Sequence, residues 1–316
     1  MVNNPLVSVI IPTFNRKDML VRCVDSVLAS TYKKIEIIIA DDASTDGTEG
    51  IIKNRYYTNK NVLYIKNNKE LLLSATINKA LRVAKGKYIF ILDDDNVVDK
   101  NCISELVSTF NKYKEVGIVG PLAFYYSKKD TIMHAGTIRS QFMRRAIYPF
   151  ANEKWNGQIR EGLEVEDFAN AFMFKRELLK EVGMWDLLVP AMGEDGDFEA
   201  RVRKAGYKAV INPKAITYHD IPYDPQRTYF FRVNKMRLYH VMHSKILYVY
   251  RYDSLIQKIT FTISIPVYLS FYILAILKDK NDKFKKSELF SAFIRGVIDG
   301  FSDAIRHRSK IEWPTE

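Results

Sequence analysis

Three aspartates, Asp93, Asp94 and Asp95, follow directly after the apolar segment Tyr88–Leu92. Carboxylates packed this closely repel one another, so a bound cation would stabilise the group. Two of them at positions i and i+2 can reach one hard divalent cation through the turn. Such a cation can bridge a diphosphate and neutralise a departing phosphate group. A solvated turn in front of the next helix is the alternative for this segment.

Two further acidic pairs have the residue types for chemistry. Asp41 and Asp42 end another apolar segment, where one carboxylate can accept a hydrogen bond from a nucleotide base, or the segment is an ordinary turn. Glu194 and Asp195 can supply a carboxylate that removes a proton from a hydroxyl nucleophile. Their alternative is a helix start, whose dipole favours acidic residues. His219 follows an aromatic segment, and a single histidine is more often structural than a metal ligand.

The elements that must position these residues alternate in type over the first 120 residues. The sequence predicts strands at 7–11, 35–40, 62–65, 88–92 and 116–119 and helices at 18–29, 48–55, 74–84 and 99–113, with Ser74 as a helix cap. Strands that are apolar on both faces and joined by helices predict a parallel sheet in an α/β fold. Ligands bind such sheets at the carboxyl ends of the strands. The acidic groups Asp41–Asp42 and Asp93–Asp95 fall at such ends.

The chain divides into three predicted parts, 1–120, 121–225 and 226–316. The last part begins with a basic stretch: residues 227–258 hold seven basic side chains and one acidic one. The uncharged segment 259–277 follows, at the lower length limit for a membrane span and with Pro266 in its middle, where we expect a kink. A basic stretch beside an apolar one favours anionic lipid over nucleic acid as a partner. A span, a re-entrant or interfacial anchor and a buried core helix all remain open, and residues 289–305 predict an amphipathic helix.

Composition narrows the class of protein further. The chain has 316 residues and a net charge of +11, within the range of ordinary globular proteins. Its two cysteines, Cys23 and Cys102, cannot form a disulfide framework or a zinc knuckle, and we expect buried free thiols in a reducing compartment. The N-terminus has no signal-peptide pattern, so secretion is not expected.

Five segments, taken in order, resemble the inverting family-2 glycosyltransferases and, among these, the rhamnosyltransferase-like branch. The opening strand and loop lie at residues 7–16, the acidic turn at 40–48 and the DxD strand at 84–95. The acceptor-side motif lies at 183–201 and the closing strand at 206–219. The resemblance implies the GT-A fold: a Rossmann-like nucleotide-binding sheet in 1–120 and an acceptor-side α/β extension in 121–225. A helical, membrane-associated segment in 226–316 would complete the chain.

The resemblance also implies a role for each matching residue. The reaction would be a metal-assisted single displacement from a nucleotide sugar to a hydroxyl group, with Asp195 as the catalytic base and Glu194 as the second candidate. Mn²⁺ or Mg²⁺ would be held by Asp93, Asp95 and His219. Donor-binding residues would be Pro12, Thr13, Phe14, Asn15, Arg16, Asp41, Asp42, Asn78, Asp93 and Asp94, and the choice between Asp41 and Asp42 as the base-binding residue stays open. Asn78 stands where the family often has an Arg-Asn pair, and Ile77 replaces the arginine.

These roles imply partners and a location. The donor would be a UDP- or dTDP-sugar, with GDP-sugars also open, and the acceptor a glycan or a polyprenyl-linked saccharide. We expect the enzyme at the cytoplasmic face of the cell membrane, in contact with lipid and without a nucleic-acid partner. Transfer to polyprenyl phosphate is the alternative reaction, and a non-catalytic nucleotide-binding membrane scaffold is the alternative class. The sugar, the linkage and the oligomeric state stay open.

Overall fold

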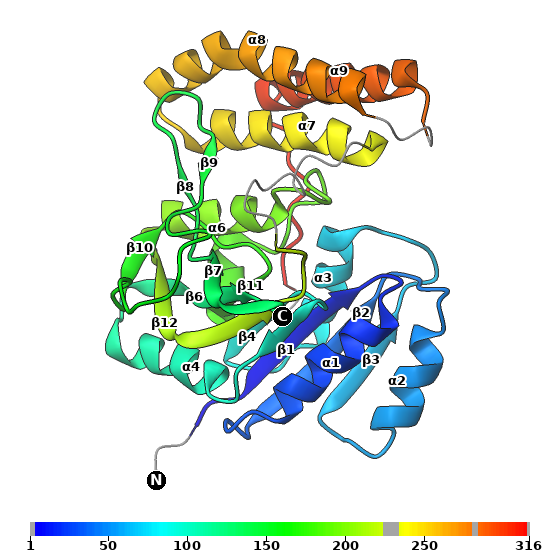
Figure 1. Ribbon diagram of the computed structural model, residues 1–316, viewed down its shortest axis with the longest axis vertical. Coiled ribbons are helices and arrows are strands. Elements are labelled where there is room, and N and C mark those ends of the chain that lie inside the picture. The colour runs from blue at the N-terminus through cyan, green and yellow to red at the C-terminus, as the bar shows by residue number, and fades with distance from the viewer. Residues whose placement is uncertain (1–3, 224–233, 280–283, 315–316) are drawn as a thin grey trace.

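The computed structural model of the protein describes residues 4–223, 234–279 and 284–314. Its centre is a ten-stranded mixed sheet with the order β10-β12-β6-β11-β4-β1-β2-β3, to which β5 adds beside β12 and β7 beside β6 (Figure 1). The strands of this sheet are β1 (Val7–Thr13), β2 (Ile35–Asp41), β3 (Val62–Lys66), β4 (Tyr88–Leu92), β5 (Asn96–Val98), β6 (Val116–Tyr125), β7 (Lys128–His134), β10 (Leu163–Val165), β11 (Ala171–Lys175) and β12 (Lys208–His219). A separate hairpin pairs β8 (Ile138–Arg139) with β9 (Ala146–Ile147).

Helices cover both faces of the sheet because its strands are apolar on both sides. One face packs against α1 (Lys17–Leu28), α2 (Thr48–Tyr56) and α4 (Cys102–Lys112). The other face packs against α3 (Leu73–Val83), α5 (Leu179–Val182), which continues the short 3₁₀ turn η1 (Arg176–Leu178), and α6 (Glu194–Lys204). Cys23 and Cys102 are buried free thiols in α1 and α4, as predicted.

The prediction of a parallel sheet is correct only for part of it. Strands β3, β2, β1 and β4 pair in parallel, but β11 runs antiparallel between β4 and β6. The prediction missed this because the direction of pairing is a long-range property that a short apolar segment does not encode. The predicted cap is also wrong: Leu72 precedes α3, and the Ser74 hydroxyl instead donates to the Val189 carbonyl at 2.6 Å.

Strand β12 connects the outer part of the sheet to the acidic turn after β4. It runs parallel to β6, and its last three residues pair antiparallel with β5. In that ladder His219 lies opposite Asn96, the residue after Asp95. The predicted part boundary at residue 120 falls within β6, so the first two predicted parts share one sheet. The boundary at 225, and Arg227 and Arg232 of the basic stretch, lie outside the described residues.

Three helices form a layer apart from the sheet (Figure 1): α7 (Lys235–Tyr252), α8 (Leu255–Lys278) and α9 (Lys286–Ile305). Apolar side chains from all three pack into a core of their own. Arg251, near the end of α7, joins this layer to the sheet domain by ion pairs of 3.0 Å to Asp186 and 2.9 Å to Asp197. Helix α9 contains the amphipathic helix predicted for residues 289–305. Its apolar face is turned partly toward α7 and α8.

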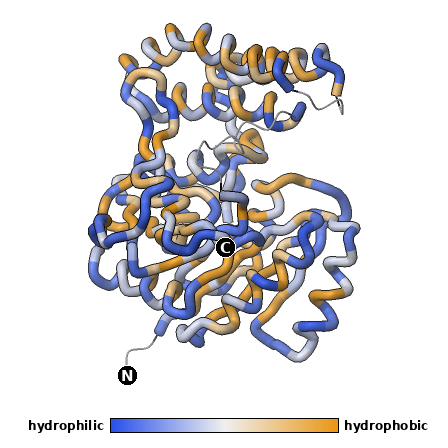
Figure 2. Tube along the Cα trace, in the orientation of Figure 1, coloured by the Kyte–Doolittle hydropathy of each residue, from blue (hydrophilic) through white to orange (hydrophobic). Residues whose placement is uncertain are grey.

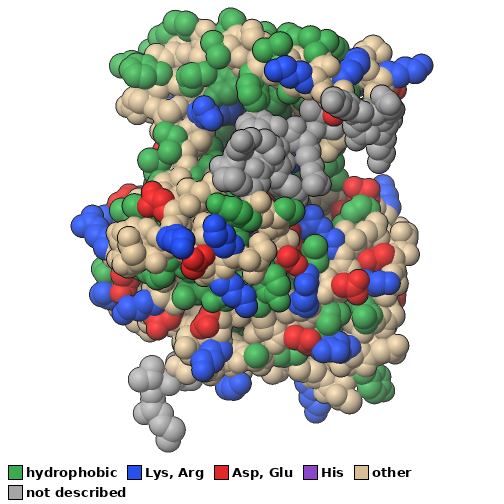
Figure 3. Space-filling view, viewed as in Figure 1, with side chains coloured by type: hydrophobic (Ala, Val, Ile, Leu, Met, Phe, Trp, Pro, Cys, Tyr) green, Lys and Arg blue, Asp and Glu red, His purple; other side chains and the backbone are tan. Residues whose placement is uncertain are grey.

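Helix α8 is long and apolar enough to cross a membrane by length and composition. Its inner face buries Phe261, Ile265 and Ile276, and the helix continues through Pro266. Apolar residues recur along its whole length (Figure 2), and the outer face leaves Ile256 and Ile263 each 73% exposed. Hydrophobic side chains accordingly gather over this layer on the surface (Figure 3). The alternative of a buried core helix is excluded by this exposure.

Candidate functional site

The carboxyl ends of β1, β2 and β4 bring the first group of site residues together. In the parallel register Thr13 lies opposite Asp41, and the Asp42 amide donates to the Thr13 carbonyl at 2.9 Å. Asp93 follows β4 directly. A cavity of about 340 Å³ opens at this edge of the sheet, and its lining includes Pro12, Thr13, Phe14, Arg16, Asp42, Asp93 and Asp94. We call it the donor cavity, after the donor-binding role that the sequence predicts for these residues.

The structure distinguishes between the two aspartates after β2. Asp41 points into the fold, where its carboxylate accepts from the Tyr64 hydroxyl and from the Ser44 amide. Asp42 lines the donor cavity. Its carboxylate also accepts from the backbone amides of Leu71 at 2.8 Å and Leu72 at 2.9 Å, which fixes the loop before α3. Of the two, Asp42 has the position from which a base can be contacted.

Arg16 lies over the acidic turn and partly neutralises it. Its guanidinium is 3.1 Å from Asp94 Oδ1 and 2.8 Å from Asp95 Oδ2. The Thr13 hydroxyl donates to the other Asp94 oxygen at 2.6 Å. Burial raises the pKa of Asp94 to about 6, although the bonds from Thr13 and Arg16 act in the opposite direction. Arg16 thus stands where the turn faces the donor cavity.

Asp95 and His219 form the next contact around the turn. His219 Nε2 is 3.0 Å from Asp95 Oδ1, and both side chains are largely buried. Burial pushes the pKa of Asp95 up, but His219 and Arg16 hold it below its ordinary value. His219 Nδ1 is buried without a hydrogen-bond partner among the described residues. Oxygen and imidazole nitrogen are ligands of divalent transition metals, so this pair fits one edge of a metal site.

No group of three or more His, Cys, Asp or Glu side chains in the described ranges is already arranged to hold a metal ion. Asp93 belongs to the same turn, and its pKa is raised strongly by burial and then by Asp95 and Asp195. A cation at this point would reduce the repulsion among these carboxylates.

A second cavity, of about 450 Å³, lies between the sheet domain and α7. Its lining includes Asp93, Glu194, Asp195 and His219, and we call it the acceptor cavity. Asp93 is therefore shared by both cavities. Glu194 and Asp195 begin α6, where the helix dipole favours acidic residues, and both are turned toward this cavity.

The two carboxylates at the start of α6 are held in an environment that favours protonation. Burial, and then Glu194, raises the pKa of Asp195 well above its ordinary value, against a hydrogen bond from the Trp185 indole at 3.2 Å. Burial raises the pKa of Glu194 to about 7. The Trp185 ring stacks on Phe198 with centroids 4.2 Å apart, so the donor to Asp195 is rigidly placed.

Two predicted donor-binding residues occupy other positions. Asn15 braces the loops behind the donor cavity: its side-chain oxygen accepts from the Thr45 amide at 2.8 Å. Asn78 is fully buried in α3 and bonds to the backbone of Trp185 and to Glu312, and neither cavity lining includes it. Both ends of the Asn78 amide are used within the fold, so this side chain is not placed to bind a donor.

Sequence reasoning missed the basic wall of the acceptor cavity. This wall comes from the hairpin β8–β9 and from α7, which contribute Arg139, Arg144, Arg237, Lys245 and Tyr248. The hairpin strands are two residues long, too short for a periodicity signal. The basic stretch is visible in the sequence. Which of its side chains face a cavity depends on how α7 packs against the rest of the fold.

The chain belongs to a defined family. A family model described as Glycosyl transferase family 2 matches residues 8–183, more than half of the chain. In Escherichia coli, UDP-Glc:alpha-D-GlcNAc-diphosphoundecaprenol beta-1,3-glucosyltransferase WfaP is 38% identical over 128 residues, which are 40% of this chain and 49% of WfaP. The chain thus spans about half the length of this relative.

Solved structures show the same fold. Staphylococcus aureus TarS 1–349, in complex with UDP-GlcNAc, aligns with a TM-score of 0.61 at 16% identity, over 92% of this chain and 81% of TarS. The mannosyltransferase PcManGT from Pyrobaculum calidifontis, in complex with GDP-Man and Mn²⁺, aligns with a TM-score of 0.59 at 17% identity, over 97% of this chain and 89% of that one. The chain therefore has the GT-A fold expected from its motifs, with an apolar C-terminal helix added.

Proposed function

We propose that the protein is an inverting glycosyltransferase that moves a sugar from a nucleotide sugar to a hydroxyl group of a glycan or lipid-linked saccharide. The observation that carries this proposal is that Asp93 lines both cavities. A donor in one cavity and an acceptor in the other would meet at this residue. Single displacement requires such an arrangement, because nucleophile and leaving group lie on opposite sides of the anomeric carbon.

The donor nucleotide would lie in the donor cavity, with its base against Thr13 and Asp42. A carboxylate can accept the N3–H of uracil or thymine, so UDP- and dTDP-sugars both fit this contact. GDP-sugars stay open, since TarS was solved with UDP-GlcNAc and PcManGT with GDP-Man. Arg16 would turn toward the diphosphate, whose charge competes with that of Asp94 and Asp95.

A divalent metal would be held by Asp95 and His219, with Asp93 as the third ligand, and PcManGT was solved with Mn²⁺. When bound, Mn²⁺ or Mg²⁺ stabilises the negative charge of the departing nucleoside diphosphate. The protein itself supplies the ligand oxygens and the imidazole nitrogen, and Arg16 balances the carboxylates that remain.

Asp195 would act as the general base on the acceptor hydroxyl, and Glu194 is the second candidate. Burial raises the pKa of Asp195, and a carboxylate with a raised pKa is a stronger base when it is ionised. The Trp185 indole keeps one oxygen of Asp195 in place and favours its ionised form.

The acceptor would be presented at the cytoplasmic face of the membrane, with α8 lying in the lipid surface. The inner face of α8 packs against α7 and α9. If α8 crossed the membrane as a full span, it would have to leave this shared core. An interfacial helix keeps that core and buries the outer apolar face in lipid. The name of WfaP describes a lipid-diphosphate-linked acceptor, which favours the same class of acceptor here.

A donor panel tests this function. Purified full-length protein with Mn²⁺ would be incubated with UDP-, dTDP- and GDP-sugars and a membrane lipid extract, and released nucleoside diphosphate would be measured. We expect release from one nucleotide class and its loss in Asp95→Ala. Full activity in Asp195→Asn would instead favour polyprenyl phosphate as the acceptor, since this anion needs no base. Absence of donor binding with every nucleotide sugar would contradict the proposal.

A further inference from the structure

One side chain of the basic wall has no anionic partner among the residues that the structure describes. Lys245 on α7 is partly buried and lines the acceptor cavity together with Asp195. Its ammonium donates to the Arg144 carbonyl at 3.1 Å and to the Tyr268 hydroxyl at 3.3 Å. Within the described part of the chain no carboxylate lies within ion-pair distance of it.

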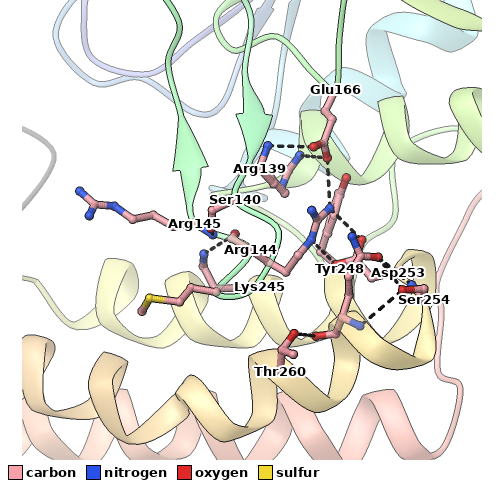
Figure 4. A network of polar contacts seen from close by, with 12 residues as sticks. Arg139, Ser140, Arg144, Arg145, Glu166, Lys245, Tyr248, Asp253, Ser254 and Thr260 are labelled. Carbon is pink, nitrogen blue, oxygen red and sulfur yellow. Dashed lines mark hydrogen bonds and ion pairs between the residues drawn. The ribbon is translucent and has the colours of Figure 1, made fainter.

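The two buried arginines beside it are paired (Figure 4). Arg144 forms two bonds with Asp253, at 2.6 and 2.9 Å, and an ion pair of 3.2 Å with Glu166. Arg139 pairs with Glu166 and Asp167. The pair with Asp253 anchors the β8–β9 hairpin to the end of α7, and the pairs with Glu166 and Asp167 anchor it to the segment after β10. The arginines therefore already have a structural task.

Even a partly buried cation without a counter-ion loses part of its solvation, and a bound anion offsets that loss. Burial, and then the charges of Arg139 and Arg144, lowers the pKa of Lys245 to about 7. Arg237 lies about two turns before Lys245, in the first turn of α7. It adds a second basic side chain to the same cavity lining. The upper part of the acceptor cavity is therefore suited to a negatively charged group.

The position of Lys245 indicates which kind of molecule carries that anion. On one side, its cavity reaches Asp195. On the other side, its ammonium contacts Tyr268 of α8, the helix with the exposed apolar face. A ligand that follows this path has a hydroxyl-bearing group first, an anion next and an apolar chain last.

We propose that Lys245 binds the phosphate of a lipid-linked acceptor, with the acceptor sugar at Asp195 and the apolar chain directed toward α8. The proposal rests on the proposed glycosyltransferase function and names its acceptor subsite. Phosphate could also come from the donor diphosphate or from free pyrophosphate in solution, and the experiment separates these sources.

The test compares two acceptors that differ only in the anion. One is a hexosamine joined through a diphosphate to a dodecyl chain, and the other is the dodecyl glycoside of the same hexosamine. Lys245→Met keeps the length of the side chain and removes the charge. Lys235→Met is the matched control, because Lys235 lies on the same helix, 41% exposed and outside the acceptor cavity.

For Lys245→Met we expect the KM of the diphosphate acceptor to rise roughly 10- to 100-fold, the effect of losing one charge-assisted hydrogen bond. The KM of the dodecyl glycoside and the KM of the donor should stay unchanged, which also shows that the variant is folded. Lys245→Arg should retain most of the preference for the diphosphate acceptor. Lys235→Met should behave as the wild type.

Three results would overturn the inference. Equal KM values of the two acceptors in the wild type would show that no anion is recognised. An equal rise for both acceptors in Lys245→Met would assign Lys245 a structural role. A rise confined to the donor KM would assign the ammonium to the donor diphosphate.

Binding of dodecyl diphosphate, measured by calorimetry in the absence of donor, gives a readout that does not need catalysis. We expect binding that weakens in Lys245→Met and exceeds that of inorganic pyrophosphate, because the chain contributes. Equal affinity for pyrophosphate alone would show a simple phosphate site and contradict the lipid assignment. Failure of the donor panel with intact dodecyl diphosphate binding would reject the enzyme function and leave this site in place.

Discussion

Asn78 holds both backbone groups of Trp185. Its amide nitrogen donates to the Trp185 carbonyl at 2.9 Å, and its amide oxygen accepts from the Trp185 N–H at 2.9 Å. Trp185 in turn donates its indole N–H to Asp195. A residue expected to touch the donor thus positions the tryptophan that donates to the proposed base.

Trp185→Phe should shift the pH dependence of catalysis. The indole bond favours ionised Asp195, so its loss raises the pKa of this carboxylate further. Because the base acts in its ionised form, the acid limb of the kcat profile should move to higher pH, by roughly 1 to 2 units. A profile of kcat against pH checks this, with the donor KM as the internal control. An unmoved limb would contradict the role of Trp185, even if kcat fell.

Glu194→Gln should stabilise the fold at alkaline pH. Burial raises the pKa of Glu194 from 4.5 to about 7, so the folded state binds more protons than the unfolded state between these values. Stability from this group therefore falls as pH rises through that window. Removing the charge should increase the free energy of unfolding at pH 8 by up to about 3 kcal/mol, with little change near pH 4. Urea unfolding at both pH values measures this, and an equal effect at both would refute the assignment.

Asp42→Asn and Asp41→Asn form a matched pair for the nucleotide base. We expect Asp42→Asn to raise the donor KM roughly tenfold, since an amide accepts the base N–H more weakly than a carboxylate. Asp41→Asn should lower the melting temperature through its bonds to Tyr64 and Ser44 and leave the donor KM unchanged. Steady-state kinetics and thermal unfolding of both variants separate these effects. The reverse pattern would assign the base contact to Asp41.

Ile263→Glu should weaken binding to anionic lipid vesicles. Ile263 is 73% exposed on the outer face of α8, and burying such a side chain in lipid contributes about 1.5 to 3 kcal/mol. Co-sedimentation with phosphatidylglycerol vesicles should show at least a roughly tenfold loss of affinity. Tyr57→Glu, at an 88% exposed position in the sheet domain, is the control and should bind as the wild type. Equal binding of the two variants would show that α8 does not enter lipid.

Much of the donor half could be predicted from the sequence because its signals are local. Short apolar strands followed by Asp41–Asp42 and Asp93 identify the side of a parallel sheet at which the carboxyl ends of its strands lie. The positions of α1 and α4 follow from helical spacing. The carboxyl ends of neighbouring strands then meet by geometry alone. The resemblance of five ordered motifs supplied the family and the fold, which the family model and the solved structures confirm.

The remaining features depend on contacts between distant residues. The antiparallel insertion of β11, the use of Asn78 by Trp185 and the placement of Lys245 all join segments more than 50 positions apart. A buried amide in a helix has the same sequence signature whether it binds a ligand or a backbone. The orientation of α7, which turns a basic stretch toward a cavity, follows from packing against α9 and from the Arg251 ion pairs.

The most direct test of the central claim is the anomeric configuration of the product, read by proton NMR from a reaction with the donor that the panel identifies. The account predicts a new glycosidic bond of configuration opposite to that in the donor, and loss of this product in Asp195→Asn while donor binding persists. A product that retains the donor configuration, or full product formation by Asp195→Asn, would contradict a single displacement with Asp195 as the base.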